Sequence, residues 1–271
     1  GQRVFLGGNI TVSPLSFLDD VQAEDIVVLE LSSWQLGDLR NRHNAQARPL
    51  LAPRVAIITS ILHDHLDRYG NMESYVEDKK EIYRGQDKGD VAIFLDDAWG
   101  DAFAKDCPAR VLRYAAKEGP GIDAFLAEDG SGRVLPKQGP VELFPKEALT
   151  RGLHQRQNLL AVGLALCDIG FSPTQIAPAL ASFTGIEHRL EEFAQHRGRV
   201  FYNDTAATIP EASIHALESF SQEVVLVCGG SDKELDFRPL AKAAHRARAL
   251  VLFAGTASEK LMPLLKAEGL S

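Results

Sequence analysis

The sequence predicts an α/β protein with two units, each built on a mostly parallel sheet. Short apolar runs rich in valine and isoleucine alternate with segments compatible with helices, which is the pattern of βαβ units. This alternation starts again after about residue 184, with a fresh set of apolar runs. A chain of 271 residues with 45% hydrophobic residues can form two cores. We therefore expect a first unit at 1–183 and a second, doubly wound and Rossmann-like unit at 184–271.

The first unit contains apolar runs that are typical of buried parallel strands. Residues 97–150 are richer in turns and favour short antiparallel strands, and Gly170 is a predicted helix stop. The predicted strands are 3–8, 25–31, 55–61 and 90–96, and the predicted helices are 72–85, 154–170 and 172–183.

The second unit repeats the pattern over a shorter length. Its predicted strands are 199–205, 223–230 and 249–255, and its predicted helices are 210–220, 237–247 and a last one after residue 255.

Composition excludes several classes of partner. A formal net charge of −8 and a pI near 5.5 argue against nucleic acid and against an anionic membrane surface. No apolar run approaches the roughly 20 residues of a membrane span, and no signal-peptide pattern opens the chain. Three widely spaced cysteines favour buried thiols in a reducing compartment. We expect a cytoplasmic monomer that acts on small molecules.

Polar or glycine-rich residues follow the predicted strands. In parallel α/β sheets ligands bind at the carboxyl ends of the strands, so this clustering predicts a ligand site. The segments are "GGN" at 7–9, "ELSS" at 30–33, "HDHLDRY" at 63–69, "NDTAAT" at 203–208 and "GGSDKELDF" at 229–237.

Glu30 interrupts an apolar run, and a buried carboxylate is costly unless it is paired or bound to a metal. It could also simply meet solvent where the strand ends. Together with His65 at a neighbouring strand end, it could hold a hard divalent cation beside a phosphate. The alternative for His65 is a capping or core histidine, and this is the preferred interpretation of His63.

Three further residues allow two interpretations each. Lys79 lies one turn after Tyr75 on a charged helix, where lysines are usually solvated. Asn158 opens an apolar helix, where it could cap the helix or contact a nucleotide. Arg189 follows the predicted junction and offers a planar fork to phosphate, or an ion pair to Glu191 or Glu192.

Seven segments together resemble one family. In order, they are "GGNI", "ELSSWQL", "HDHLDRYGNMESYVEDKKEIY", "HQRQNLLAV", "GIEHRLE", "FYNDTAAT" and "GGSDKELDF". Over essentially its whole length the chain is similar to the Mur ligases, and most to the members that add D-glutamate to UDP-N-acetylmuramoyl-L-alanine in peptidoglycan precursor synthesis. The resemblance implies a central ATP-binding domain at 1–183 and the first part of a ligase domain at 184–271. It also implies amide synthesis driven by ATP through an acyl phosphate.

The resemblance also implies roles for individual residues. Glu30 and His65 match magnesium ligands, and Lys79 matches a carbamylated lysine that holds a second magnesium ion. The implied catalytic residues are His65, Lys79 and Lys233. The implied nucleotide contacts are Asn158, Arg189 and Asp204, and the implied substrate contacts are Asn9, Ser32, Gln35, Thr208 and Lys233.

Several features depart from the family pattern. The chain has no G-x-x-x-x-G-K-[ST] phosphate loop, which the family places upstream of "GGNI". We expect a fragment that also lacks the amino-terminal domain and the carboxyl-terminal end, and that is inactive alone. Ala206 stands where the D-glutamate-adding members commonly have lysine. The alternatives are another Mur ligase, a folylpolyglutamate-type ligase, or a non-catalytic relative that binds a nucleotide or a partner protein.

Overall fold

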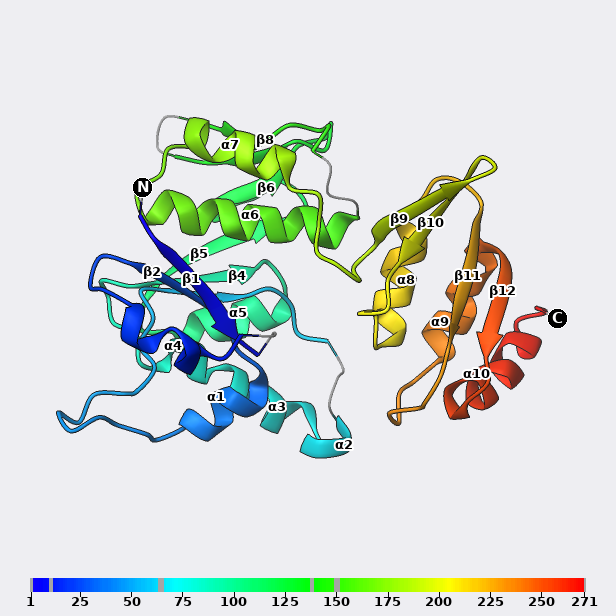
Figure 1. Cartoon of the computed structure of the whole chain (residues 1–271), viewed down its shortest axis with the longest axis horizontal. Coiled ribbons are helices and arrows are strands. Elements are labelled where there is room, and N and C mark those ends of the chain that lie inside the picture. Colours follow the sequence, from blue (N-terminus) through cyan, green and yellow to red (C-terminus); the bar gives the residue numbers. More distant parts are fainter. Residues whose placement is uncertain (1, 10–11, 63–65, 137–138, 149–151, 271) are drawn as a thin grey trace.

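The computed structural model describes residues 2–9, 12–62, 66–136, 139–148 and 152–270. Figure 1 shows two bodies, one from blue to green and one from yellow to red, which meet where α7 leads into β9. The expected boundary near residue 184 lies in this connection, and the division into domains stays a prediction. None of the helices in the described part of the chain is long and apolar enough to cross a membrane.

The first unit is built on a six-stranded sheet in the order β3-β4-β5-β6-β7-β8. The pairs from β3 to β6 are parallel and those from β6 to β8 are antiparallel, so the mostly parallel sheet is confirmed. The strands are β3 (Val55–Ile58), β4 (Val91–Leu95), β5 (Arg110–Ala115), β6 (Ala124–Leu126), β7 (Gly132–Val134) and β8 (Val141–Phe144).

Helices cover both faces of this sheet, so the unit has a core on each side. Because side chains alternate along a strand, Ile93 of β4 joins one core and Phe94 the other. Ile93 packs with Leu160 of α6, whereas Phe94 packs with Phe103 of α5. The helices are α3 (Met72–Lys79), α4 (Glu81–Arg84), α5 (Ala98–Asp106), α6 (Leu153–Asp168) and α7 (Pro173–Ser182).

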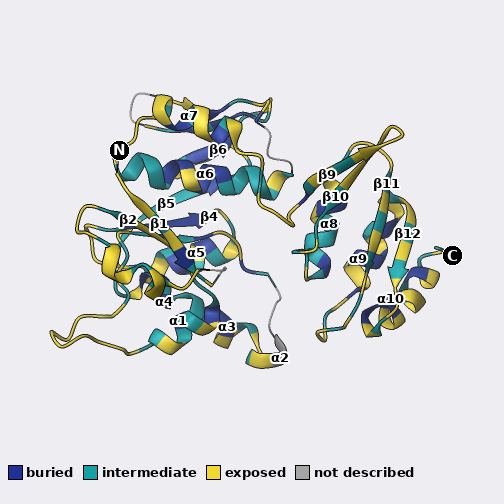
Figure 2. Ribbon diagram, in the orientation of Figure 1, coloured by how far each residue is buried: buried dark blue, intermediate teal, exposed yellow. Residues whose placement is uncertain are grey.

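Strands β1 (Val4–Gly8) and β2 (Ile26–Glu30) form a separate parallel pair. The sequence predicts a buried strand here, and that prediction is wrong for this chain. Val27, Val28 and Leu29 are 41%, 46% and 37% exposed, and Figure 2 shows the pair largely in yellow. Within the described residues β2 pairs with β1 alone, and its apolar side chains are only partly covered. The remaining short helices of the first unit are η1 (Pro14–Ser16), η2 (Leu18–Asp20), α1 (Ser33–Leu39) and α2 (Leu66–Tyr69).

The second unit combines an antiparallel hairpin with a parallel strand pair. Leu226 and Leu252 pack with the helices in one core, whereas Val227 and Phe253 point to the opposite face and are exposed. The elements are β9 (Glu191–His196), β10 (Arg199–Asn203), α8 (Pro210–Glu218), β11 (Val224–Gly229), α9 (Arg238–Ala243), η3 (Ala244–Arg246), β12 (Ala247–Phe253) and α10 (Thr256–Ala267).

Candidate functional site

Asn9 and Glu30 lie side by side at the carboxyl ends of β1 and β2. The parallel register sets Gly8 opposite Glu30, and the backbone N–H of Asn9 donates to the carbonyl oxygen of Glu30 at 2.7 Å. Gly8 has φ of 117°, and a Cβ there would lie 2.0 Å from the same oxygen. Only glycine allows this close approach. The side chain of Glu30 is exposed at the strand end, where it is open to solvent or to a cation.

Ser32 and Gln35 form the capping box of α1. The hydroxyl of Ser32 accepts from the backbone N–H of Gln35 at 3.2 Å, and the Gln35 side-chain oxygen accepts from the backbone N–H of Ser32 at 2.9 Å. Both predicted substrate residues therefore begin the helix that follows Glu30. Their side chains are engaged with each other here.

Asp78 joins the helices around Lys79. Its carboxylate accepts from the Arg40 guanidinium and, at 2.9 Å, from the hydroxyl of Tyr69. Tyr69 also hydrogen-bonds with Ser33. The pKa of its phenol is raised, chiefly because the group is partly buried. These contacts fasten α1, α2 and α3 together just before Lys79. The half-buried Lys79 has its ammonium 5.5 Å from the centre of the Tyr75 ring, within cation–π range.

The predicted magnesium ligand His65 lies outside the described residues, as does His63. Of the three predicted metal ligands, the structure therefore describes Glu30 and Lys79. Within the described residues, no group of three or more His, Cys, Asp or Glu side chains could hold a metal ion.

Arg189 and Asp204, two of the three predicted nucleotide contacts, lie close together at the junction of the units. The third, Asn158, is on the neighbouring helix α6. Asp204 accepts from the backbone N–H of Leu190 at 2.9 Å, directly after Arg189. Burial raises the pKa of Asp204, and the charge of Arg189 opposes that shift. The charge of Arg189 also acts on His154, one turn before Asn158 on α6. Arg189 therefore lies close to both units.

Arg156, in the same segment as Asn158, has a structural role. Its guanidinium donates to the carbonyl oxygens of Gly130 at 2.8 Å and Lys146 at 3.0 Å. It ties the start of α6 to two loops of the first unit. Burial lowers its pKa.

Thr208 and Lys233 are exposed on two different loops of the second unit. Within the described part of the chain, no hydrogen bond or ion pair joins either residue to Glu30. Ala206 packs near Arg189, because its backbone N–H donates to the carbonyl oxygen of His188 at 3.0 Å. These predicted substrate residues are thus not brought together with the first-unit residues in this structure.

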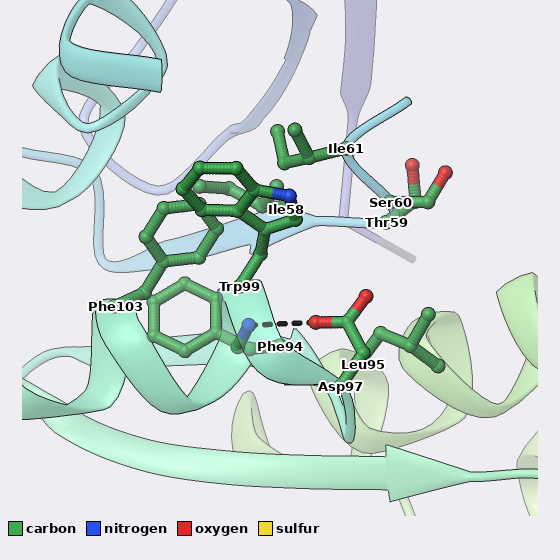
Figure 3. Close-up of a pocket in the computed structure, with 10 residues that line it drawn as sticks. Ile58, Thr59, Ser60, Ile61, Phe94, Leu95, Asp97, Trp99 and Phe103 are labelled. Atoms are coloured by element: carbon green, nitrogen blue, oxygen red, sulfur yellow. Dashed lines mark hydrogen bonds between the residues drawn. The ribbon is translucent and has the colours of Figure 1, made fainter. Parts of the chain in front are cut away.

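A small open hollow lies beyond the carboxyl ends of β3 and β4 (Figure 3). Asp97 accepts from the backbone N–H of Gly100 at 2.7 Å, which begins α5. Tyr114 donates to the carbonyl oxygen of Thr59 at 2.8 Å and fixes the rim. None of the predicted site residues that the structure describes lines this hollow; the polar Thr59 and Ser60, directly after β3, are the signal in the sequence that could indicate it. Its lining is Ile58, Thr59, Ser60, Ile61, Phe94, Leu95, Asp97, Trp99, Gly100 and Phe103.

Comparison with known proteins decides the family. The Mur ligase middle domain matches residues 8–166, more than half of the chain. The chain belongs to the Mur ligase family. It is 37% identical over 98% of its length to the UDP-N-acetylmuramoylalanine–D-glutamate ligase of Treponema pallidum (strain Nichols). It is 38% identical over 96% of its length to the ligase of that name from Roseiflexus sp. (strain RS-1). This Mur ligase chain spans 62% and 57% of the length of those two relatives.

Solved structures of Mur ligases share the fold. The MurF ligase of Thermotoga maritima in complex with ADP matches with a TM-score of 0.66 at 18% identity, over 98% of this chain and 74% of that one. MurF from Acinetobacter baumannii matches with a TM-score of 0.64 at 20% identity, over 98% of this chain and 70% of that one.

We expect Asp204→Asn to stabilise the Mur ligase chain at neutral pH. Burial disfavours the ionised carboxylate, so its pKa is raised and its contribution to stability falls as pH rises from the ordinary value, about 4, through the raised one. Asparagine keeps the acceptor for Leu190 without the charge. Thermal unfolding should show a higher Tm for Asp204→Asn at pH 7 and a smaller difference at pH 4. Asp236→Asn is the control, because the Arg238 guanidinium lowers the pKa of that carboxyl and its loss should not raise the Tm. An unchanged or lower Tm for Asp204→Asn contradicts this account.

Proposed function

We propose that the chain is part of an ATP-dependent ligase that adds D-glutamate to UDP-N-acetylmuramoyl-L-alanine, acting in the cytoplasm as a monomer. The observation that carries this proposal is the name shared by the relatives at 32% to 38% identity, UDP-N-acetylmuramoylalanine–D-glutamate ligase. Family membership alone would leave the amino acid open, since the matching solved structures include ligases with other names.

The proposed chemistry is activation of a carboxylate by ATP. The substrate carboxylate attacks the γ-phosphorus, ADP leaves, and the amine of the incoming amino acid displaces phosphate from the acyl phosphate. Fixed cations and hydrogen-bond donors stabilise charge on the transferring group. Arg189 offers a planar fork of donors to phosphate, and Asp204 offers acceptors to ribose hydroxyls. Their positions at the junction would let the second unit act on a nucleotide held by the first.

The donor chemistry of the first unit fits magnesium. Magnesium prefers oxygen ligands and keeps several waters, and the exposed carboxylate of Glu30 stands at a strand end where both are possible. The ammonium of Lys79 cannot ligate a cation. Addition of CO₂ to its Nζ, with loss of a proton, would give a carbamate that can. Glu30, His65 and carbamylated Lys79 would then hold two ions, which would neutralise charge on the phosphates.

The phosphate loop would come from the rest of the protein. No G-x-x-x-x-G-K-[ST] occurs in the 271 residues, and the chain spans less than two thirds of the length of its curated relatives. Strands β2 and β3 each have one edge without a partner among the described residues, and Val27 to Leu29 are exposed. A further strand from the longer protein would cover such surfaces. We therefore expect the 271 residues to be inactive alone.

A second candidate function is that of a Mur ligase that adds another amino acid. The observation that favours it is the alanine at position 206, where the D-glutamate-adding members commonly have lysine. Without a cation at this position the carboxylates of D-glutamate would need another donor. A non-catalytic relative is the alternative from a different class. An intact phosphate-loop motif about twenty residues upstream of Gly1 in the encoding gene would favour the enzyme, and a gene without one would favour the binding protein.

Phosphate release with a panel of amino acids tests the proposal. The complete protein would receive ATP, magnesium and UDP-N-acetylmuramoyl-L-alanine, with D-glutamate, L-glutamate, L-alanine, diaminopimelate or L-lysine. We expect D-glutamate to give a rate at least about a hundredfold above the others, because a site built for its carboxylates leaves polar groups unpaired with the wrong substrate. The same panel without the nucleotide sugar is the control. A clear preference for another amino acid would assign the sister activity.

The carbamate proposal predicts chemical rescue of Lys79→Ala. This variant of the complete protein should lose ligation, and short carboxylic acids such as acetate should restore part of it by replacing the carbamate. Lys80→Ala is the matched control, since the neighbouring Lys80 pairs with Asp106 at 2.7 Å and should neither lose ligation nor respond to acetate. Wild-type activity in Lys79→Ala would remove the lysine from the reaction.

A further inference from the structure

The amino-terminal end of α6 lies near α8 (Figure 1), and a side chain from each helix bridges the two units there. The ring centres of His154 on α6 and His215 on α8 are 5.7 Å apart, with the planes tilted by 35°. Gly152 has φ of 81°, and a Cβ on it would lie 2.7 Å from the hydroxyl of Ser219. The contact is therefore tight beside the histidines. It brings together residues separated by about 60 positions in the sequence.

The charged groups around the two rings are mostly positive. Arg189, from the segment between the units, acts electrostatically on His154. The only carboxylate that the described contacts place on the pair is that of Glu218, 3.6 Å from Nδ1 of His215. Glu218 is shared, because its other oxygen lies 3.8 Å from the guanidinium of Arg246. A proton on His154 would thus add a positive charge to a site with two arginines and one carboxylate.

Burial lowers the pKa of His154, and the neighbouring His215 and Arg189 lower it further. The closed contact therefore favours the neutral ring. His154 is half-buried between the units, whereas the side chain of His215 is exposed and lies beside Glu218.

We propose that His154 and His215 form a proton-sensitive contact that holds the second unit against α6. With His154 neutral, the rings pack and α8 stays seated on the end of the helix. Protonation of His154 places a new positive charge beside His215 and Arg189 in a partly dry contact, where repulsion is strong. The two units then separate about the connection between α7 and β9.

The direction of the pH effect follows from linkage. Because the closed form lowers the pKa of His154, it binds fewer protons than the open form. The contact is complete above the ordinary pKa of histidine, about 6.5, and weakens as pH falls below it. Arg189 and Asp204 lie at the same junction, so opening would move them relative to Asn158.

Small-angle X-ray scattering between about pH 8 and about pH 5.5 tests this contact. The wild-type chain should increase in radius of gyration by at least about 1 Å as pH falls, with far-UV circular dichroism unchanged. His154→Phe keeps a ring but cannot titrate, so it should stay compact at both pH values. His245→Phe, on a histidine outside this contact, should expand as the wild type does. A constant wild-type radius, or an expansion that persists in His154→Phe, overturns the proposal.

A second pair of variants tests the contact without acid. Gly152→Ala should increase the radius of gyration at about pH 8, because its Cβ would lie 2.7 Å from the hydroxyl of Ser219 and 3.1 Å from the ring of His154, and both would have to shift. Gly170→Ala at the other end of α6 is the matched control: it has φ of 105° and nothing within 4 Å of the added carbon. Equal radii for the two variants would show that the end of α6 does not hold the second unit.

Discussion

The parallel register of β1 with β2 is the constraint on which the candidate site depends. It places Gly8 opposite Glu30 and lets the backbone N–H of Asn9 reach the Glu30 carbonyl. A side chain at Gly8 would occupy the space of that carbonyl oxygen, so the pairing requires glycine there. The capping box of α1 starts two residues later at Ser32. One strand pairing thus aligns a carboxylate, an amide and a helix start along the same edge.

The second unit keeps groups that are unfavourable for its own stability. The carboxylate of Asp204 is half-buried, and the backbone of Leu190 gives it a hydrogen bond that does not offset its desolvation. Val227 and Phe253 face solvent on the open side of the β11–β12 pair. Groups of this kind are expected where a protein binds a ligand or packs against further structure, because selection there acts on function more than on local stability.

The sequence predicts most strands and helices, because apolar runs and caps are local signals. The sequence does not predict strand β9, since "EEFAQH" shows no apolar alternation and, within the described ranges, the strand pairs only with β10. Burial of β2 was predicted wrongly, because burial depends on neighbours that no local pattern specifies.

The closeness of Asn9 and Glu30 could be predicted from the rule on strand ends. The Asp78 contacts could not, since Arg40 lies 38 residues away and only tertiary packing joins them. The predicted helix 72–85 is present as α3 and α4, which are separated by Lys80 alone, and the backbone of Lys80 stays in the α-helical region.

The affinity of the complete protein for Mn²⁺, a paramagnetic substitute for magnesium, tests the assignment of Glu30 most directly. Titrations followed by electron paramagnetic resonance in the presence of ADP would compare Glu30→Ala with Glu24→Ala, an exposed carboxylate ahead of β2. Loss of a direct ligand should weaken Mn²⁺ binding by at least about tenfold. The account predicts this loss for Glu30→Ala and wild-type affinity for Glu24→Ala. Equal Mn²⁺ affinity in the wild type and in Glu30→Ala would contradict it.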